Sequence, residues 1–244
     1  MAIGTLYLFP VPLAPDAVLA SIPAKGLALI NEIDEYIVEN PKTARRFLKE
    51  MGLKTPQADL ILHDYGKHQR DKVPSKSFLA AALSGKSLGL MSEAGCPGIA
   101  DPGAEIVAEA HRLGIPVVPL VGPSSILLAL MGSGFNGQQF AFHGYLPIEK
   151  KDRATRVAEL ERESAQKGQT QLFIETPFRN ESLLAELIRL LKPTTRLCVA
   201  MDLTAATEQI ISKTVQQWKT TSIGAGKAVE LHKRPAIFLL LASK

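Results

Sequence analysis

The sequence predicts an α/β protein of two domains, the first built on a mostly parallel sheet and the second on a mixed sheet. Short apolar segments alternate with amphipathic ones through the first half, which is typical of strands joined by crossover helices. In the second half, long charged helices separate the apolar segments. Rigid and flexible residues are combined at 119–123, where the sequence reads Pro-Leu-Val-Gly-Pro. We therefore expect an N-terminal domain at residues 1–120 and a C-terminal domain at 121–244.

In the first half, we expect strands at 5–9, 28–30, 59–63, 88–91 and 115–120, because each is a short apolar run. Helices are expected at 16–22, 40–51, 75–83, 104–113 and, after the boundary, 124–131. Asn40 and Pro41 are typical of a helix start, and Gly52 of its end. Asp101 with Pro102 predicts a second N-cap, for the helix that carries Glu105 in its first turn.

In the second half, the expected strands are 140–145, 171–175, 196–201, 209–215 and 236–241, with long charged helices at 151–166 and 179–191. A short helix is expected after residue 215. Helices covering a sheet with both strand directions are the natural outcome of this order.

Composition and charge restrict the class of protein. Of 244 residues, 46% are hydrophobic and 21% are charged, which is a globular composition. No apolar run approaches the roughly 20 residues that cross a bilayer, and the first residues lack the basic leader of a signal peptide. Two cysteines are too few for a disulfide framework, and no cluster has metal-ligand spacing. We expect a cytoplasmic protein without a membrane segment or a metal.

Charge is distributed unevenly between the halves. The net charge is +4, and residues 1–120 hold 12 Lys and Arg against 13 Asp and Glu, giving −1. Residues 121–244 hold 16 against 11, giving +5. A polyanionic partner is therefore expected to meet the second half.

The most informative segment is the loop Ser92–Gly103, which lies between a predicted strand and a predicted helix. Its glycines permit close approach of a ligand to the backbone, and Pro97 and Pro102 stiffen it. A glycine-lined turn at the carboxyl end of a strand is where open α/β sheets bind ligands. An ordinary strand-to-helix turn is the alternative.

Six motifs in order resemble the tetrapyrrole methylase superfamily of S-adenosylmethionine-dependent methyltransferases, over nearly the whole chain. The first strand, the serine-acidic-alanine-glycine loop with its aspartate-proline-glycine turn, and a glycine-proline segment come first. The later matches are a tyrosine-leucine-proline, a glutamate-x-proline-x-arginine turn and a leucine-threonine segment. They lie at Thr5–Leu8, Ser92–Gly103, Gly122–Ser125, Tyr145–Pro147, Glu175–Arg179 and Leu203–Thr204. The resemblance is strongest to the branch that methylates the 2′-hydroxyl of a cytidine in small-subunit ribosomal RNA.

The resemblance implies two α/β domains with S-adenosylmethionine in the cleft between them, and a homodimer that acts on ribosomal RNA. The cofactor-binding residues it implies are Pro10, Ser92, Glu93, Ala94, Gly95, Pro123, Ser124, Ser125, Glu175, Thr176, Met201, Leu203, Pro235 and Ala236. A carboxylate should hold the attacking hydroxyl, and Glu93 and Glu175, with Asp202 as a further candidate, are placed for it. Arg179 and Arg45 are the candidate substrate contacts.

The alternatives without a functional role are a surface carboxylate for Glu93, an ion pair for Arg179 and a solvated helix face for Arg45. The chain also departs from the pattern of the ribosomal RNA branch, mostly on the acceptor side. Ala205 replaces a lysine, and Arg234-Pro235-Ala236 replaces a glycine-glutamate pair. A methylase for a small tetrapyrrole-like molecule, and a binding protein without catalysis, are therefore the alternative functions.

Overall fold

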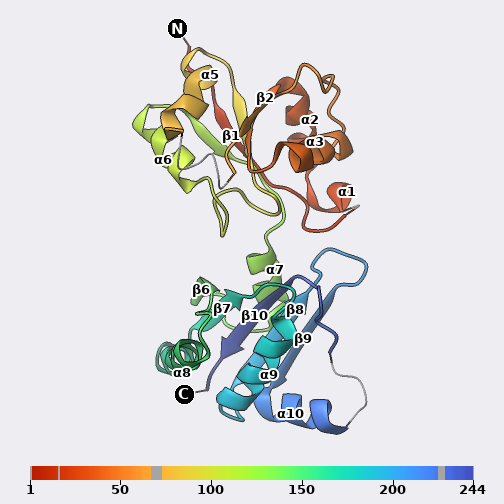
Figure 1. Cartoon of the computed structure of the whole chain (residues 1–244), viewed down its shortest axis with the longest axis vertical. Helices are drawn as coiled ribbons and strands as arrows, with labels where there is room; N and C mark the ends of the chain where they lie inside the picture. The colour runs from red at the N-terminus through yellow and green to blue at the C-terminus, as the bar shows by residue number, and fades with distance from the viewer. Residues whose placement is uncertain (1, 16, 67–72, 225–228, 244) are drawn as a thin grey trace. The chain divides into compact units, whose positions relative to one another are not determined.

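The computed structural model describes residues 2–15, 17–66, 73–224 and 229–243. The chain divides into two compact units, Met1–Ser124 and Ser125–Lys244, and each is built on its own five-stranded sheet (Figure 1). The first sheet is parallel and the second is mixed, which confirms the predicted fold class.

Unit 1 has a sheet in which every pair of neighbouring strands is parallel, in the order β3-β2-β4-β1-β5. The strands are β1 Leu6–Phe9, β2 Glu35–Val38, β3 Ile61–Asp64, β4 Leu88–Met91 and β5 Val117–Pro119. The helices are α1 Val18–Ser21, α2 Ala24–Leu29, η1 Ile30–Glu32, α3 Pro41–Glu50, η2 Ser75–Leu79, α5 Ala80–Leu83 and α6 Ala104–Arg112.

Two hydrophobic cores lie on the two faces of this sheet. Successive strand residues point to opposite faces, so Val38 packs with α3 in one core while Ile37 packs with η2 and α6 in the other. In Figure 1, α2 and α3 accordingly lie on one side of the strands, and α5 and α6 on the other. The sheet is thus covered on both faces, as parallel sheets are.

Local sequence explains some element boundaries and not others. The side chain of Asn40 accepts hydrogen bonds from the N–H groups of Lys42 and Thr43, which confirms the predicted cap of α3. The predicted cap at Asp101 is wrong, because Gly103 occupies the N-cap of α6 and Pro102 precedes the helix. The expected helix at 16–22 corresponds to α1, and Asp16 lies outside the described residues.

The strand predicted at residues 28–30 is also wrong. These residues end α2 and begin η1, and the second strand is β2 at Glu35–Val38. Ile30 is fully buried in the core next to α3. A three-residue apolar run does not distinguish a strand from a buried helical turn, and here helical packing prevails.

Unit 2 has a mixed sheet in the order β6-β7-β10-β8-β9. The strands are β6 Phe140–Tyr145, β7 Thr170–Ile174, β8 Arg196–Met201, β9 Gln209–Thr214 and β10 Ala236–Leu241. β6 and β7 are parallel, and the other neighbours are antiparallel. The helices are α7 Ser125–Ser133, α8 Lys150–Lys167, α9 Asn180–Leu190 and α10 Val215–Gly224.

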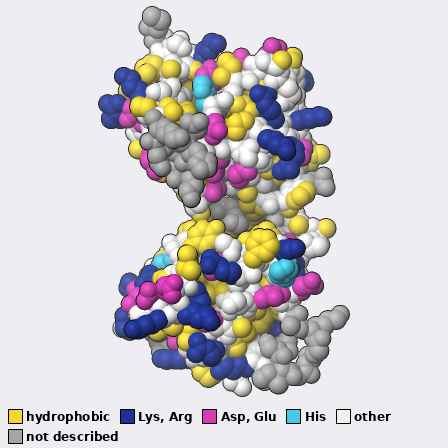
Figure 2. All heavy atoms as spheres, in the orientation of Figure 1, with side chains coloured by type: hydrophobic (Ala, Val, Ile, Leu, Met, Phe, Trp, Pro, Cys, Tyr) yellow, Lys and Arg dark blue, Asp and Glu magenta, His cyan; other side chains and the backbone are white. Residues whose placement is uncertain are grey.

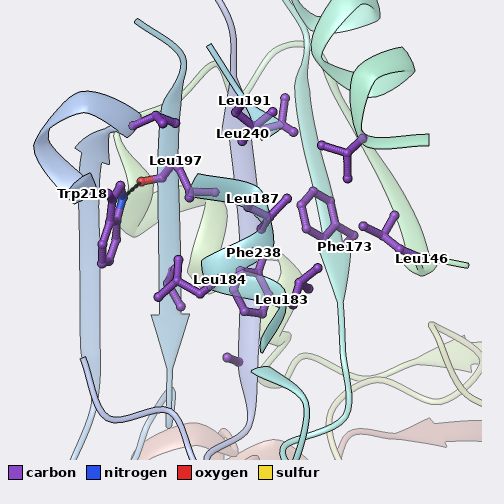
Figure 3. Packing of buried hydrophobic residues seen from close by; sticks show 14 of the residues in the cluster. Leu146, Phe173, Leu183, Leu184, Leu187, Leu191, Leu197, Trp218, Phe238 and Leu240 are labelled. Atoms are coloured by element: carbon purple, nitrogen blue, oxygen red, sulfur yellow. Dashed lines mark hydrogen bonds between the residues drawn. The ribbon is translucent and has the colours of Figure 1, made fainter. Parts of the chain in front are cut away.

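The main core of unit 2 lies between one sheet face and helices α8, α9 and α10. Phe173 and Phe238 stack at its centre, and the indole N–H of Trp218 donates to the carbonyl of Leu197 at 2.9 Å (Figure 3). Helix α7 covers the opposite face, because Ile210 contacts Gly132 of α7 while the next residue, Ile211, packs against the main core. The sheet is therefore covered on both faces.

Candidate active site

Unit 1 has a topological switch point between β1 and β4. These neighbouring strands are parallel, and the chain leaves β1 toward β2 but leaves β4 toward β5, on the opposite side. Open α/β sheets bind ligands at such a point, outside the carboxyl ends of the strands. The loop Ser92–Gly103 begins there, as does the segment that follows Phe9.

Three loops meet at this edge of unit 1. Val11 and Gly95 exchange two backbone hydrogen bonds of 2.8 Å, which joins the loops after β1 and β4. The segment after β5 closes against them, since a Cβ at Gly122 would lie 2.3 Å from Cβ of Pro10. The Cys96 thiol donates to the carbonyl of Pro123 at 3.4 Å. Six of the predicted cofactor residues, Pro10, Ser92, Glu93, Ala94, Gly95 and Pro123, therefore lie in one loop cluster or directly beside it.

Side chains in this cluster differ in their exposure to solvent. Glu93 is exposed, and its backbone N–H donates to the Glu39 carboxylate at 3.2 Å. Burial raises the pKa of the Asp101 carboxyl, a hydrogen bond with Ser92 opposes this rise, and the charge of Glu93 adds to it. Burial also raises the pKa of the Cys96 thiol, which makes it a poor nucleophile. Glu93 is the exposed carboxylate of the glycine loop.

The glutamate-x-proline-x-arginine turn of unit 2 is held together by its own side chains. Glu175 follows β7 and is buried, and its Oε1 accepts from the Thr176 N–H at 2.6 Å. The same oxygen accepts from Nε and Nη2 of Arg179, at 3.1 and 2.7 Å. Glu175 thus organises the turn. Arg179 forms the ion pair that the sequence indicates as the alternative to a substrate contact.

A second set of turns lies at the same edge of the unit 2 sheet. The end of β8 pairs with the start of β10, as Met201 opposite Ala236, and the end of β7 reaches Ile237. Asp202 donates its N–H to the carbonyl of Pro235 at 3.0 Å. The segments that carry Thr176, Leu203 and Pro235 are therefore neighbours within unit 2.

Other predicted residues have different local surroundings within their own units. Met201 is fully buried and belongs to the hydrophobic core of unit 2, as does Ala236, so their side chains fill that core. Arg45 lies on α3, where its Nη1 donates to the carbonyl of Gln57 at 2.6 Å. Ser124 ends unit 1, and Ser125 begins α7.

Sequence reasoning missed two residues at the unit 2 edge. The Asn180 side chain donates from Nδ2 to the carbonyl of Arg234 at 2.7 Å, and Arg234 forms an ion pair with Asp202 at 2.7 Å. Asn180 directly follows the arginine of the motif, and Arg234 precedes Pro235. Neither has a local signal, because each acts on a partner more than 30 positions away.

Two general features of the described residues bear on function. Among them, His, Cys, Asp and Glu side chains form no group of three or more that could hold a metal ion. In the same part of the chain, no helix combines the length and the apolar character that a membrane span needs.

Comparison with known proteins gives concordant results. Residues 17–218 match the family model of the tetrapyrrole (corrin/porphyrin) methylases. The ribosomal RNA small subunit methyltransferase I of Vibrio cholerae is 31% identical over 205 residues, which cover 84% of this chain and 67% of the relative. The protein of the same name from Synechocystis is 30% identical, covering 87% of this chain and 72% of the relative.

Solved structures show the same fold. The methyltransferase CobJ superposes with a TM-score of 0.62 at 16% identity, over 98% of this chain and 94% of its own. The uroporphyrin-III-C-methyltransferase from Thermus thermophilus gives a TM-score of 0.51 at 16% identity, over 98% of this chain and 92% of its own. The family match extends across both units. This chain belongs to the tetrapyrrole methylase family of S-adenosylmethionine-dependent methyltransferases.

Proposed function

We propose that this enzyme methylates RNA, and that its acceptor is the 2′-hydroxyl of a cytidine in small-subunit ribosomal RNA. The names of the Vibrio and Synechocystis relatives support the ribosomal RNA part of the proposal. The resemblance to the branch that modifies a cytidine 2′-hydroxyl supports the finer part. We further propose that the enzyme works in the cytoplasm as a homodimer.

One structural observation favours RNA as the acceptor: exposed aromatic rings and basic side chains occur together at the strand-end edge of unit 2. Tyr145 is 61% exposed and Phe178 is 69% exposed. The Phe178 ring meets that of His232 edge-on, with centroids 6.1 Å apart, and Lys233 is exposed beside it. Figure 2 shows hydrophobic side chains next to Lys and Arg side chains on the surface of unit 2. Aromatic faces with nearby cations are the usual surface for unpaired bases.

The residues of the two edges fit S-adenosylmethionine in their chemistry. The Gly95 backbone has φ of +70°, and the absence of a side chain there lets a ligand approach the peptide groups of the loop. In unit 2, Thr204 Oγ1 and Asn180 Oδ1 are buried without a hydrogen-bond partner among the described residues, so each has an unused polar atom. Ser92–Gly95, Pro123, Thr176, Leu203 and Pro235 are the residues that we propose hold the cofactor.

When bound, S-adenosylmethionine supplies a methyl group already activated by a positively charged sulfur. The protein's main contribution is therefore positioning of the acceptor. We assign the contact with the attacking hydroxyl to Glu93, whose exposed carboxylate is free to accept a proton on a rigid loop. Glu175 is the weaker candidate for that task, since its Oε1 already accepts three hydrogen bonds.

Basic side chains outside the edge supply a general attraction for RNA. Helix α3 presents Lys42, Arg46 and Lys49 to solvent, and the Arg46 side chain is 64% exposed. Arg45 on the same helix is half-buried and bonded to Gln57, so we expect a smaller contribution from it. In α8, Arg153 is buried against Glu186 and is structural.

Transfer of labelled methyl groups tests the proposal directly. Wild-type protein with methyl-labelled S-adenosylmethionine should label small-subunit RNA, and nuclease digestion should place the label on a cytidine ribose. Phe178→Ala should lower kcat/KM for RNA about tenfold, because loss of one stacked base costs about 1–3 kcal/mol. Phe178→Tyr, which keeps the ring, should retain most activity. Label on a tetrapyrrole and none on RNA would establish the small-molecule alternative, and no transfer to either acceptor would favour a binding protein.

A further inference from the structure

The guanidinium of Arg234 joins two turns at the strand-end edge of unit 2. Its Nε donates to Asp202 Oδ2 at 2.7 Å, and its Nη2 donates to the carbonyl of Thr207 at 2.6 Å. Its Nη1 donates to Gln209 Oε1 at 3.3 Å and to the carbonyl of Glu230 at 3.2 Å. All three nitrogen atoms are used, and the Arg234 and Asp202 side chains are only 19% and 15% exposed.

The backbone of both joined turns is strained. Four non-glycine residues in the described part of the chain have positive φ, and three of them lie here: Asp202 at +50°, Thr204 at +70° and Lys233 at +61°. The left-handed region is least favourable for a β-branched residue such as Thr204. Strained backbone persists only where its surroundings hold it, and it is concentrated at functional sites.

Arg234 also connects these turns to the motif after β7. The Asn180 side chain donates to the Arg234 carbonyl at 2.7 Å, and the N–H of Lys233 donates to the carbonyl of Pro177 at 3.1 Å. Asp202 Oδ2 accepts a further hydrogen bond from Thr207 Oγ1 at 2.8 Å. Arg234 therefore lies where the three segments to which we assign cofactor contacts in unit 2 meet, with its side chain joining two of them and its backbone contacting the third.

A base role for Asp202 does not agree with this arrangement. Its carboxylate accepts hydrogen bonds from Arg234 and Thr207 at Oδ2, and these hold it within the protein. A carboxylate fixed in a shielded ion pair with a guanidinium is a structural partner rather than a proton acceptor. Two of the departures of this chain from the family pattern, Ala205 and Arg234-Pro235, lie in the two segments that the ion pair joins.

We propose that Arg234 is a positioning residue for the methyltransferase reaction, which holds Leu203 and Thr204 in the strained conformation that binds the cofactor. The inference rests on the cofactor contacts proposed above for unit 2. It does not depend on the acceptor, since a cofactor-binding turn is needed for methyl transfer to any substrate.

Calorimetric titration with S-adenosylhomocysteine, the demethylated cofactor, tests this role without an acceptor. Arg234→Ala should weaken binding at least tenfold. Arg234→Lys should be intermediate, because an ammonium cannot contact Asp202, Thr207 and Gln209 at once. Asp202→Asn should weaken binding less than Arg234→Ala, and the double variant should be no worse than Arg234→Ala alone. Added guanidinium at millimolar concentration should partly restore the affinity of Arg234→Ala.

Arg112→Ala is the matched control, since it removes an arginine with a 2.6 Å ion pair to Glu109 on the surface of unit 1. Its affinity for S-adenosylhomocysteine should equal that of the wild type. Wild-type affinity in folded Arg234→Ala and Arg234→Lys would overturn the inference, even if both variants melt at lower temperature. Wild-type protein that binds S-adenosylhomocysteine but does not methylate RNA would overturn the proposed acceptor and leave this inference standing.

Discussion

The two glutamates among the catalytic candidates, of which Glu93 is the first choice from the sequence, have different surroundings in the structure. Glu93 is exposed on the glycine loop, whereas Glu175 is buried and accepts hydrogen bonds from Thr176 and Arg179. The motifs locate both carboxylates, but the hydrogen bonds that separate their roles are visible only in three dimensions.

Glu93→Gln should therefore reduce kcat about 100-fold or more, as expected for loss of a proton acceptor, with little change in affinity for S-adenosylhomocysteine. Glu175→Gln should mainly weaken cofactor binding, because the amide cannot form the ion pair that shapes the turn. Single-turnover rates and calorimetry on both variants measure this division. A wild-type rate in Glu93→Gln would show that another group accepts the proton.

Asp101 provides a test of electrostatics in the same loop. Burial raises the pKa of this carboxyl above its usual 3.8, so the folded state binds the proton more tightly than the unfolded state does. Protonated Asp101 therefore favours the folded state, and this contribution to stability is fully present below pH 3.8 and is lost as the pH rises through the folded-state pKa. Asp101→Asn, which carries no charge, should therefore stabilise the protein at pH 8 and do so much less at pH 4.

Urea unfolding of wild type and Asp101→Asn between pH 4 and pH 8 gives this difference. Asn retains an acceptor for the Ser92 hydroxyl, so the comparison isolates the charge. A difference in unfolding free energy that stays constant across this range would contradict the assigned cause.

At the scale of elements, the sequence predicts structure best where the signal is local. The long apolar strands 140–145, 196–201 and 236–241 are confirmed at both ends, as β6, β8 and β10. Asn40 caps α3 because its side chain bonds to residues two and three positions away. The parallel direction of the strands in the unit 1 sheet was also predictable, since short strands alternate with helices along the sequence.

The sequence fails where the deciding contact is distant. Strand β2 begins with Glu35, a poor strand residue by itself, which is buried and forms a 2.8 Å hydrogen bond with His63 on neighbouring β3. The apolar run 28–30 was the stronger local signal, yet Ile30 packs as part of a helical segment. Arg234 is missed for the same reason, because its contacts with Asp202 and Thr207 are formed by chain segments far apart in sequence.

Close backbone packing of the three loops in unit 1 leads to a further prediction. Gly122→Ala should weaken S-adenosylhomocysteine binding and lower the melting temperature, because its Cβ would lie 2.3 Å from Pro10. Gly137→Ala is the control, since a Cβ there meets nothing within 4 Å. Equal affinity in the two variants would show that the packing of Gly122 on Pro10 does not shape the cofactor loops.

At the scale of the whole molecule, the net positive charge and the glycine loop belong to different units. Unit 2 carries the net positive charge, as 16 basic against 11 acidic residues from 121 to 244, while the glycine loop lies in unit 1 with net −1. An RNA acceptor should therefore bind with strong dependence on salt, and the cofactor with little.

Filter binding of small-subunit RNA between 50 and 200 mM salt should show affinity falling steeply, while the dissociation constant of S-adenosylhomocysteine changes less than twofold. Lys233→Gln should reduce the salt slope for RNA, since it removes an exposed cation beside Phe178 and His232. RNA affinity independent of salt would contradict an RNA acceptor. Light scattering on the same samples measures whether the protein is the expected homodimer.

The most basic property proposed for this chain is that it binds S-adenosylmethionine through its strand-end turns. Calorimetric titration of wild type, Gly122→Ala and Thr176→Val with S-adenosylhomocysteine tests it most directly. We predict binding to the wild type and weaker binding to each of the two variants. No binding to the wild type, or wild-type affinity in both variants, would contradict the proposal.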